Sequence, residues 1–125
     1  MLLKNISEYS GIYVACVAVD FRKSIDGLAY IVKQELKIDP FGNYLFLFCN
    51  RNGTRLKCLC WDQNGFWLGY KRLDGKGAKF VWPTSLEAAR DISISQLEKL
   101  LSGLSADPPR GFGQITARDF QVNDN

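Results

Sequence analysis

The stretch "TRLKCLCWDQNGFWLGYKR" (residues 54–72) decides the expected fold, because it reads as two strands joined by a tight turn. An Asn-Gly pair at residues 64–65 separates two runs rich in apolar side chains, which is the strongest short-range signal of a β-hairpin. A second Asn-Gly pair, at 52–53, joins the first run to the preceding segment "NYLFLFCN" (43–50). We therefore expect an antiparallel meander, with "KFVWP" (79–83) as its fourth strand.

Two-residue loops at both Asn-Gly pairs set the expected register. In the first hairpin the opposed pairs are Cys49 and Leu56, Leu47 and Cys58, and Leu45 and Cys60; in the second they are Trp61 and Leu68, Leu59 and Tyr70, and Lys57 and Arg72. Alternation then defines two faces. The cysteine face carries Leu45, Leu47, Cys49, Leu56, Cys58, Cys60 and Trp67. The aromatic–basic face carries Tyr44, Phe46, Phe48, Arg55, Lys57, Leu59, Trp61, Leu68, Tyr70 and Arg72.

The segments around the meander complete an α+β pattern. "GIYVACVAV" (11–19) predicts a buried strand, and helical spacing of apolar residues follows Ser24, a favourable N-cap, until Asp39-Pro40. We expect this helix to cover the cysteine face. Residues 84–91 suit a helical turn, "DISI" (91–94) an edge strand, and Ser95 with Glu98 a capping box for a leucine-rich helix. The predicted fold is thus a strand and helix, a four-stranded antiparallel β-meander and a short C-terminal helix.

Length and composition favour one domain. The chain has 125 residues, 46% of them hydrophobic, and a net charge of +3. We expect the domain to span residues 1–104, followed by a flexible or loosely docked tail at 105–125. No signal peptide and no apolar run of about 20 residues is seen, so we expect a cytoplasmic protein with reduced thiols and no membrane partner.

Candidate catalytic and metal-binding groups are sparse. The chain has no histidine, which excludes His-based acid–base, nucleophilic and metal-binding sites. Cys58 and Cys60 form a C-x-C on a flat strand without the turn that lets two thiolates hold one zinc, so we interpret the cysteines as core residues. The acidic residues share no metal-ligand spacing. We expect no catalytic residues, no metal and no cofactor.

Positive charge is concentrated in residues 51–82, where seven basic residues stand against two acidic ones. This excess of five exceeds the +3 of the whole chain. Basic groups beside aromatic rings suit phosphate neutralisation and base stacking. The candidate phosphate contacts are Arg55, Lys57, Lys71 and Arg72, with Trp61 and Tyr70 as anchors or stackers and Arg22 and Lys23 as a secondary site. Lys71 points to the opposite face in the expected register. A protein interface and an ordinary solvated surface explain the same pattern and stay open.

Three ordered segments resemble a known family. "VDFRKSIDGLAYIV" (19–32), "DPFGNYLFLFCNRNGTRLKCLCWDQNGFWLGYKRLDGKGAKFVWP" (39–83) and "ISQLEKLLSGL" (94–104) are similar to the TnpB-type accessory proteins of the sixty-six family of bacterial insertion sequences. That TnpB label is unrelated to the RNA-guided nuclease of the same name. The ordered set covers residues 12–104, and it is the set, not any one motif, that is specific.

The resemblance implies a protein encoded beside a transposase and needed for efficient transposition of a mobile genetic element. It carries no catalytic residues over to this chain. Together with the aromatic–basic face, it predicts a non-catalytic accessory factor that binds transposon-end DNA, the transposase or another element-encoded protein. A pure protein–protein adaptor of the transposase complex is the main alternative. A metal-dependent nuclease is the third, and it would need two or three acids clustered in a pocket.

Overall fold

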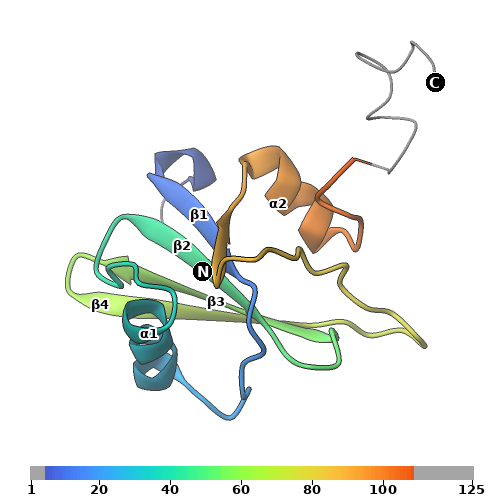
Figure 1. Ribbon diagram of the computed structural model, residues 1–125, viewed down its shortest axis with the longest axis horizontal. Helices are drawn as coiled ribbons and strands as arrows, with labels where there is room; N and C mark the ends of the chain where they lie inside the picture. Colours follow the sequence, from blue (N-terminus) through green and yellow to red (C-terminus); the bar gives the residue numbers. More distant parts are fainter. Residues whose placement is uncertain (1–4, 109–125) are drawn as a thin grey trace.

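The computed structural model describes residues 5–108, which form a five-stranded sheet with a helix on each face (Figure 1). The strands are β1 (Gly11–Ala15), β2 (Tyr44–Cys49), β3 (Arg55–Asp62), β4 (Gly65–Arg72) and β5 (Ala89–Asp91). The helices are η1 (Ile6–Glu8), a short 3-10 helix, and the α-helices α1 (Ile25–Gln34) and α2 (Ile94–Leu101). No helix in this part of the chain is long and apolar enough to cross a membrane.

The sheet is mixed, with the order β4-β3-β2-β1-β5. Strands β2, β3 and β4 form the antiparallel part of the expected meander, but β1 joins them as a parallel neighbour of β2. The prediction of a four-stranded antiparallel meander was therefore wrong in its last strand, and the strand predicted at 11–19 enters the same sheet through a parallel pairing that was not predicted. Helix α1 is the crossover between two parallel strands, the usual role of a helix in a βαβ unit.

The expected fourth strand, 79–83, is irregular chain. Its apolar side chains serve the core: Phe80 is buried, and the Trp82 indole donates to the main-chain oxygen of Ala15 at 2.8 Å. The fifth strand is instead β5, which pairs antiparallel with β1. It overlaps the expected edge strand 91–94 by one residue and replaces the end of the expected helical turn at 84–91. The strand at 79–83 was predicted from apolar content alone. Apolar side chains can be buried without the hydrogen bonds of a β-ladder, so apolar content does not by itself indicate a strand.

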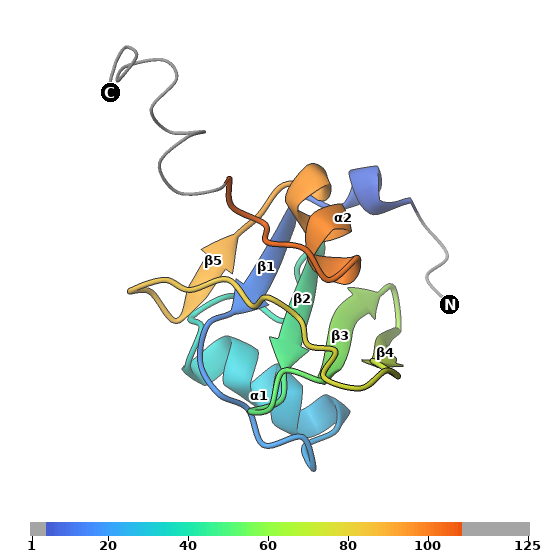
Figure 2. The ribbon, with the colours of Figure 1, turned by 90° about the vertical axis from the view of Figure 1, so that its right-hand side faces the viewer.

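Helix α1 covers the aromatic–basic face, and not the cysteine face as expected (Figure 2). Its buried residues Leu28, Ile31 and Val32 join a core cluster with Phe46, Phe48 and Leu59. Both faces of β2 are apolar, so the strand pattern could not tell which of them the helix covers. The handedness of a crossover between parallel strands decides this, and the parallel pairing was not foreseen.

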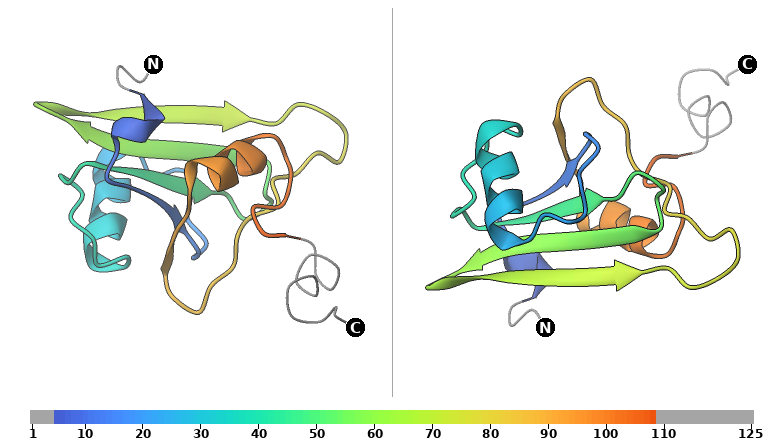
Figure 3. Two further views of the ribbon diagram at one scale, coloured as in Figure 1. Left: turned by 90° about the horizontal axis from the view of Figure 1, so that it is seen from above. Right: turned by 90° about the horizontal axis from the view of Figure 1, so that it is seen from below.

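Helix α2 and the segment around Phe80 cover the cysteine face (Figure 3). Leu97 and Leu100 pack there against a cluster that includes Cys49, Leu56 and Cys60. The sheet thus has a hydrophobic layer on both sides, which explains why its strands carry large apolar groups on both faces.

The register of the first hairpin was predicted correctly, and that of the second was not. The expected pairs Cys49 with Leu56 and Leu47 with Cys58 are confirmed. In the second hairpin the loop is Gln63-Asn64, since Asp62 pairs with Gly65. The opposed pairs there are Trp61 and Phe66, Leu59 and Leu68, Lys57 and Tyr70, and Arg55 and Arg72. The expected register was therefore wrong by two residues, although a shift of two keeps every side chain on its predicted face.

Both α-helices have polar N-caps. Ser24 precedes α1 as expected. Helix α2 starts two residues earlier than expected: its capping box is formed by Ser93, whose hydroxyl accepts from Gln96 N at 3.1 Å, and by Gln96, whose side chain accepts from Ser93 N at 2.8 Å. The helix ends before Gly103, which has the positive φ of +81° that favours glycine after a helix.

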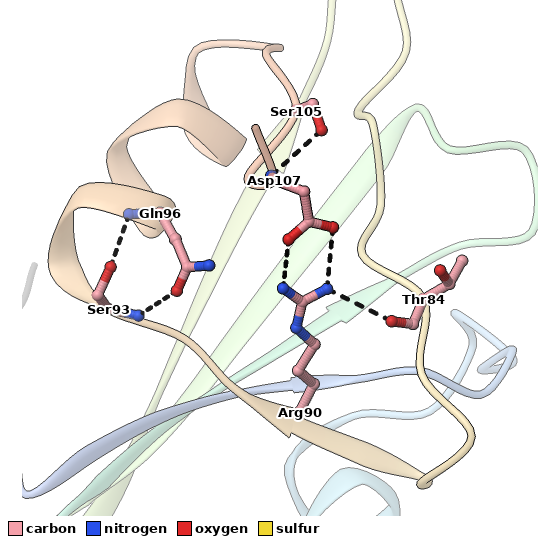
Figure 4. A network of polar contacts seen from close by, with 6 residues as sticks. All are labelled: Thr84, Arg90, Ser93, Gln96, Ser105 and Asp107. Carbon is pink, nitrogen blue, oxygen red and sulfur yellow. Dashed lines mark hydrogen bonds and ion pairs between the residues drawn. The ribbon is translucent and has the colours of Figure 1, made fainter. Parts of the chain in front are cut away.

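Arg90 of β5 connects the sheet to the chain that follows α2 (Figure 4). Its two Nη atoms bind both carboxylate oxygens of Asp107, and Nη1 also lies 3.4 Å from Thr84 O. Ala106, which precedes Asp107 in the chain, is buried, with 4% of its surface exposed. Residues 105–108, the start of the expected tail, thus contact the domain, whereas the remainder of that tail, 109–125, lies outside the described residues.

Candidate nucleic-acid interface

Three loops meet at one end of the sheet, where β1 and β2 finish and β3 starts. They are residues 16–24 after β1, 50–54 between β2 and β3, and 73–88 after β4. Main-chain hydrogen bonds join the last two, from Phe80 N to Gly53 O at 2.8 Å and from Leu73 N to Thr54 O at 2.9 Å. We call residues 16–24, 50–55 and 72–79 the basic end.

Asn50 shapes the turn at the centre of the basic end. Its side-chain oxygen accepts from the main-chain N–H groups of Thr54 and Arg55 at 2.9 and 3.1 Å, and its amide nitrogen donates to the Thr54 hydroxyl. Gly53 takes a φ of +76°, which costs a glycine little. These bonds fix the turn that presents Arg51 to solvent.

Two open pockets lie on either side of this turn. One, of about 580 Å³, lies between residues 18–22 and 50–52 and includes Arg22 and Arg51. The other, of about 390 Å³, lies between the same turn and residues 79–82 and includes Lys79. The three loops therefore form one continuous, hollowed surface on which basic side chains are spaced.

The charges at this end are unbalanced. The basic end holds seven basic residues, Arg22, Lys23, Arg51, Arg55, Arg72, Lys76 and Lys79, against the two acids Asp20 and Asp74, a net of +5. The loops at the opposite end, 5–10, 37–43 and 62–64, hold Glu8, Asp39 and Asp62 against Lys37, a net of −2. The described part of the chain is thus electrically polar along its strands, and its basic end attracts anions.

Two of the basic groups are already paired with the two acids. Arg22 binds Asp20 with Nη2–Oδ2 at 2.6 Å, and Arg72 binds Asp74 with Nε–Oδ1 at 3.0 Å. Hydrogen bonds from Arg22 hold the pKa of the Asp20 carboxyl well below its usual range. The ion pairs of the described residues include none with Lys23, Arg51, Arg55, Lys76 or Lys79, so these five exposed side chains carry the surplus charge.

The ammonium group of Lys57 forms hydrogen bonds within the domain. Its Nζ donates to the main-chain oxygens of Phe21 and Lys23, both at 2.8 Å. Burial lowers the pKa of this ammonium group, and the nearby charge of Asp20 opposes the effect. Lys57 therefore ties the loop before α1, and with it Arg22 and Lys23, to the sheet.

The remaining predicted residues lie in different places. Tyr70 is 56% exposed and its ring lies 6.5 Å from that of Phe21, beside the basic end. Lys71 lies on the cysteine face, where its Nζ donates to Leu101 O at 3.0 Å. Trp61 lies six residues along β3 from Arg55, roughly 20 Å for an extended strand. The structure thus brings Arg22, Lys23, Arg55, Tyr70 and Arg72 together and places Trp61 at the other end.

Arg51, Lys76 and Lys79 were not among the predicted site residues. Each contributed to the charge excess of residues 51–82, so the sequence held a signal for them. Their grouping with Arg22 depends on the contact of the loops 16–24 and 73–88 with the turn at 50–54, which no local pattern shows.

The cysteines lie in or against the core. Cys49 and Cys60 are buried in the cluster beneath α2, and Cys16 and Cys58 pack against it. Burial raises the pKa of the Cys49 thiol to about 11. Residues 5–108 contain no group of three or more Cys, Asp or Glu side chains placed to hold a metal ion.

Comparison with known proteins supplies a family. The family described as "IS66 Orf2 like protein" matches residues 10–111. Two relatives come from Sinorhizobium fredii and are described as uncharacterized proteins. One, y4hO, is 37% identical over 99 residues, covering 79% of this chain and 84% of the relative. The other, y4jC, is 34% identical over 93 residues, covering 74% and 78%. No solved structure matches.

Proposed function

The chain belongs to the IS66 Orf2-like family of insertion-sequence accessory proteins, and on that premise we propose that it binds transposon-end DNA through its basic end as a non-catalytic factor. The proposed phosphate contacts are the exposed side chains Lys23, Arg51, Arg55, Lys76 and Lys79, with Arg22 and Arg72 beside them. Tyr70 lies where a ring can contact sugar or base. Neutralising phosphates releases counterions, and this release supplies the affinity.

One observation carries this proposal: five exposed basic side chains without an ion pair to a described carboxylate gather on three loops that meet at one end of the sheet. Internal bonds of the domain hold each loop. A surface that is already ordered loses little conformational entropy on binding. Phosphate contacts of this kind position a protein on DNA and carry no base sequence information.

The test is fluorescence anisotropy with a labelled duplex from the terminal repeat of the element and a scrambled duplex of equal length. The variant is Arg51→Gln/Lys79→Gln, which removes one charge from the turn at 50–54 and one from the chain across the neighbouring pocket. If both side chains contact phosphate, the slope of log affinity against log salt concentration falls by about 2. Affinity falls for both duplexes, because the lost contacts are not base-specific.

The matched control is Lys33→Gln/Lys37→Gln, which changes the net charge equally at the end of α1 and in the loop that follows it, away from the basic end. We expect it to keep the wild-type salt slope. Equal losses in the two double variants would show a general charge effect and contradict the proposed interface. Absence of duplex binding at low salt would also contradict it, and the transposase would then be the partner to test.

A further inference from the structure

The acidic end of the sheet contains a pocket that the DNA proposal does not use. It has a volume of about 440 Å³ and lies between the start of β2, the end of β3 and the chain at Tyr9. Its walls include four aromatic side chains, Tyr9, Phe41, Trp61 and Trp67, and its charged lining residue is Asp62. We infer that this pocket binds an arginine side chain from a basic segment of a protein partner.

The aromatic walls are rigid. The Trp61 ring lies 5.0 Å from the rings of both Phe41 and Phe66, at interplanar angles of 85° and 71°. Edge-to-face packing of this kind is favourable and fixes the ring planes. Phe41 is nevertheless 57% exposed, a large exposure for a phenylalanine that already contacts two other rings. The cluster thus offers aromatic surface to a ligand without having to reorganise.

The carboxylate in the pocket is held in place by its neighbour. The Trp67 indole N–H donates to Asp62 Oδ2 at 3.0 Å. Within residues 5–108 no basic side chain forms an ion pair with Asp62. The Trp67 indole is the donor that these residues supply to the Asp62 side chain, so Oδ1 and the remaining lone pair of Oδ2 can accept from a ligand.

The other wall carries no charge. Tyr9 donates its hydroxyl proton to Cys60 Sγ at 3.3 Å, and burial, followed by this bond, raises the pKa of Tyr9 well above its ordinary value. The ring therefore remains a neutral phenol at any physiological pH. Glu8 and Asp39, which lie within two residues of Tyr9 and Phe41 in the chain, contribute to the net negative charge of this end.

A guanidinium group suits this combination of groups. It is planar, it stacks on aromatic faces, and it donates two parallel hydrogen bonds to a carboxylate. A positive charge over a Trp or Tyr ring adds an electrostatic attraction to the ring face. A nucleic-acid base would also stack on the rings, but its phosphates would meet the net −2 of this end. The charge therefore favours a basic protein segment over a nucleic acid.

Nuclear magnetic resonance of the indole N–H groups tests the proposal with N-acetyl-arginine amide as the probe. The resonances of Trp61 and Trp67 report on the pocket. Trp82 is an internal reference, because its indole is bonded to Ala15 O at the end of β1, and thus at the opposite end of the sheet from the pocket. We expect the probe to shift the Trp61 and Trp67 signals, and the citrulline analogue, which has the same shape without the charge, to leave them unmoved.

The decisive variant is Asp62→Asn, which keeps an oxygen for the Trp67 indole and loses the charge. It should weaken binding of the probe about tenfold, the loss expected for a hydrogen bond to a charged group. Glu98→Gln on α2 removes the same charge elsewhere and should bind as the wild type does. Dispersed amide spectra verify that each variant is folded.

Three results would overturn the inference: no shift with the arginine probe, equal shifts with citrulline, or equal affinity in Asp62→Asn. Shifts of Trp61 and Trp67 on addition of oligothymidylate would likewise overturn it, in favour of base stacking. Because Asp62 and the basic end lie at opposite ends of β3, Asp62→Asn should leave duplex affinity unchanged. The outcome is therefore separable from the outcome of the DNA experiment.

Discussion

The ammonium group of Lys57 lies 4.8 Å from the centroid of the Phe21 ring. The same group donates to Phe21 O, so one side chain fixes both the ring and the main chain of the loop before α1. A cation over an aromatic face is worth about 0.5–1 kcal/mol, and more when it is desolvated. A residue whose sequence suggested contact with phosphate is thus part of the scaffold that holds the loop.

Lys57→Met should lower the free energy of unfolding by about 1–3 kcal/mol, because two main-chain oxygens lose a charged donor. Methionine keeps most of the apolar stem, so the loss reports on the ammonium group. Urea denaturation followed by tryptophan fluorescence measures it. Arg55→Met, on the same face but exposed, is the control and should change stability by less than about 0.5 kcal/mol.

Lys57→Met also tests whether Lys57 only stabilises the fold or also contacts DNA. If Lys57 does not contact DNA, the salt dependence of duplex binding remains that of the wild type under conditions where the variant is folded. A decrease of about 1 in the salt slope would instead assign a phosphate contact to Lys57.

Asp107→Asn should lower the melting temperature by about 3 °C near pH 7, the effect of losing roughly 1 kcal/mol from a partly exposed, bidentate ion pair. The hydrogen bonds from Arg90 lower the pKa of the Asp107 carboxyl in the folded state. A lowered carboxyl pKa stabilises the fold above the ordinary value of about 3.9. The stabilisation is lost as the pH falls through the folded pKa.

The difference in melting temperature between wild type and Asp107→Asn should therefore shrink as the pH is lowered below about 4. Differential scanning calorimetry between pH 7 and pH 3 measures this. Asp91→Asn, exposed on β5 and outside the Arg90 pair, is the control and should show no such pH-dependent difference. A constant difference across the range would contradict the assignment to the ion pair.

Leu100→Ala in α2 should cost about 2–5 kcal/mol, the range for removing a buried leucine side chain. Leu100 is 0% exposed beneath the cysteine face, whereas Leu104, one turn later, is 59% exposed. Leu104→Ala is therefore the matched control and should remain within about 0.5 kcal/mol of the wild type. Similar losses in both variants would contradict the packing of α2 on the sheet.

Thiol reactivity should be slow in the folded protein. The thiolate is the reactive form, and a pKa of about 11 leaves roughly one Cys49 in a thousand ionised at pH 8. Labelling with a coloured disulfide reagent should be slow for Cys49 and Cys60 in buffer and rapid for all four cysteines in guanidinium chloride. Cys16 and Cys58, which are only half-buried, should react first, and Cys16→Ser/Cys58→Ser should remove that phase. Rapid native labelling that survives this double substitution would contradict the burial of Cys49 and Cys60.

The local elements were largely predictable because their signals are local. Asn52-Gly53 predicted the first hairpin and its register, and apolar spacing after Ser24 predicted α1. The register of the second hairpin was missed because the loop is Gln63-Asn64, with Gln63 at a φ of +52°, a conformation usual for Asn or Gly. A strand was wrongly predicted at 79–83, because Phe80 and Trp82 pack into the core from irregular chain.

The candidate site was predictable in composition and not in arrangement. The charge excess was enough to select Arg55 and Arg72 as candidates. Both lie on one hairpin, where they are opposed, so a local pattern also brings them together. Lys57 was read as exposed, because the loop that accepts its hydrogen bonds is 34 residues away in the chain. Trp61 was grouped with the basic residues on the same face, although the length of β3 separates them.

By itself the sequence determined the antiparallel strands, the two helices, the family and the excess of positive charge, since periodicity, turn residues and ordered motifs all act over short distances. Only the tertiary structure decided that α1 covers the aromatic–basic face, because the parallel pairing of β1 with β2 is a long-range contact. That one placement buries Phe46 and Phe48, engages Lys57 and leaves the free charge at one end of the sheet and the aromatic pocket at the other.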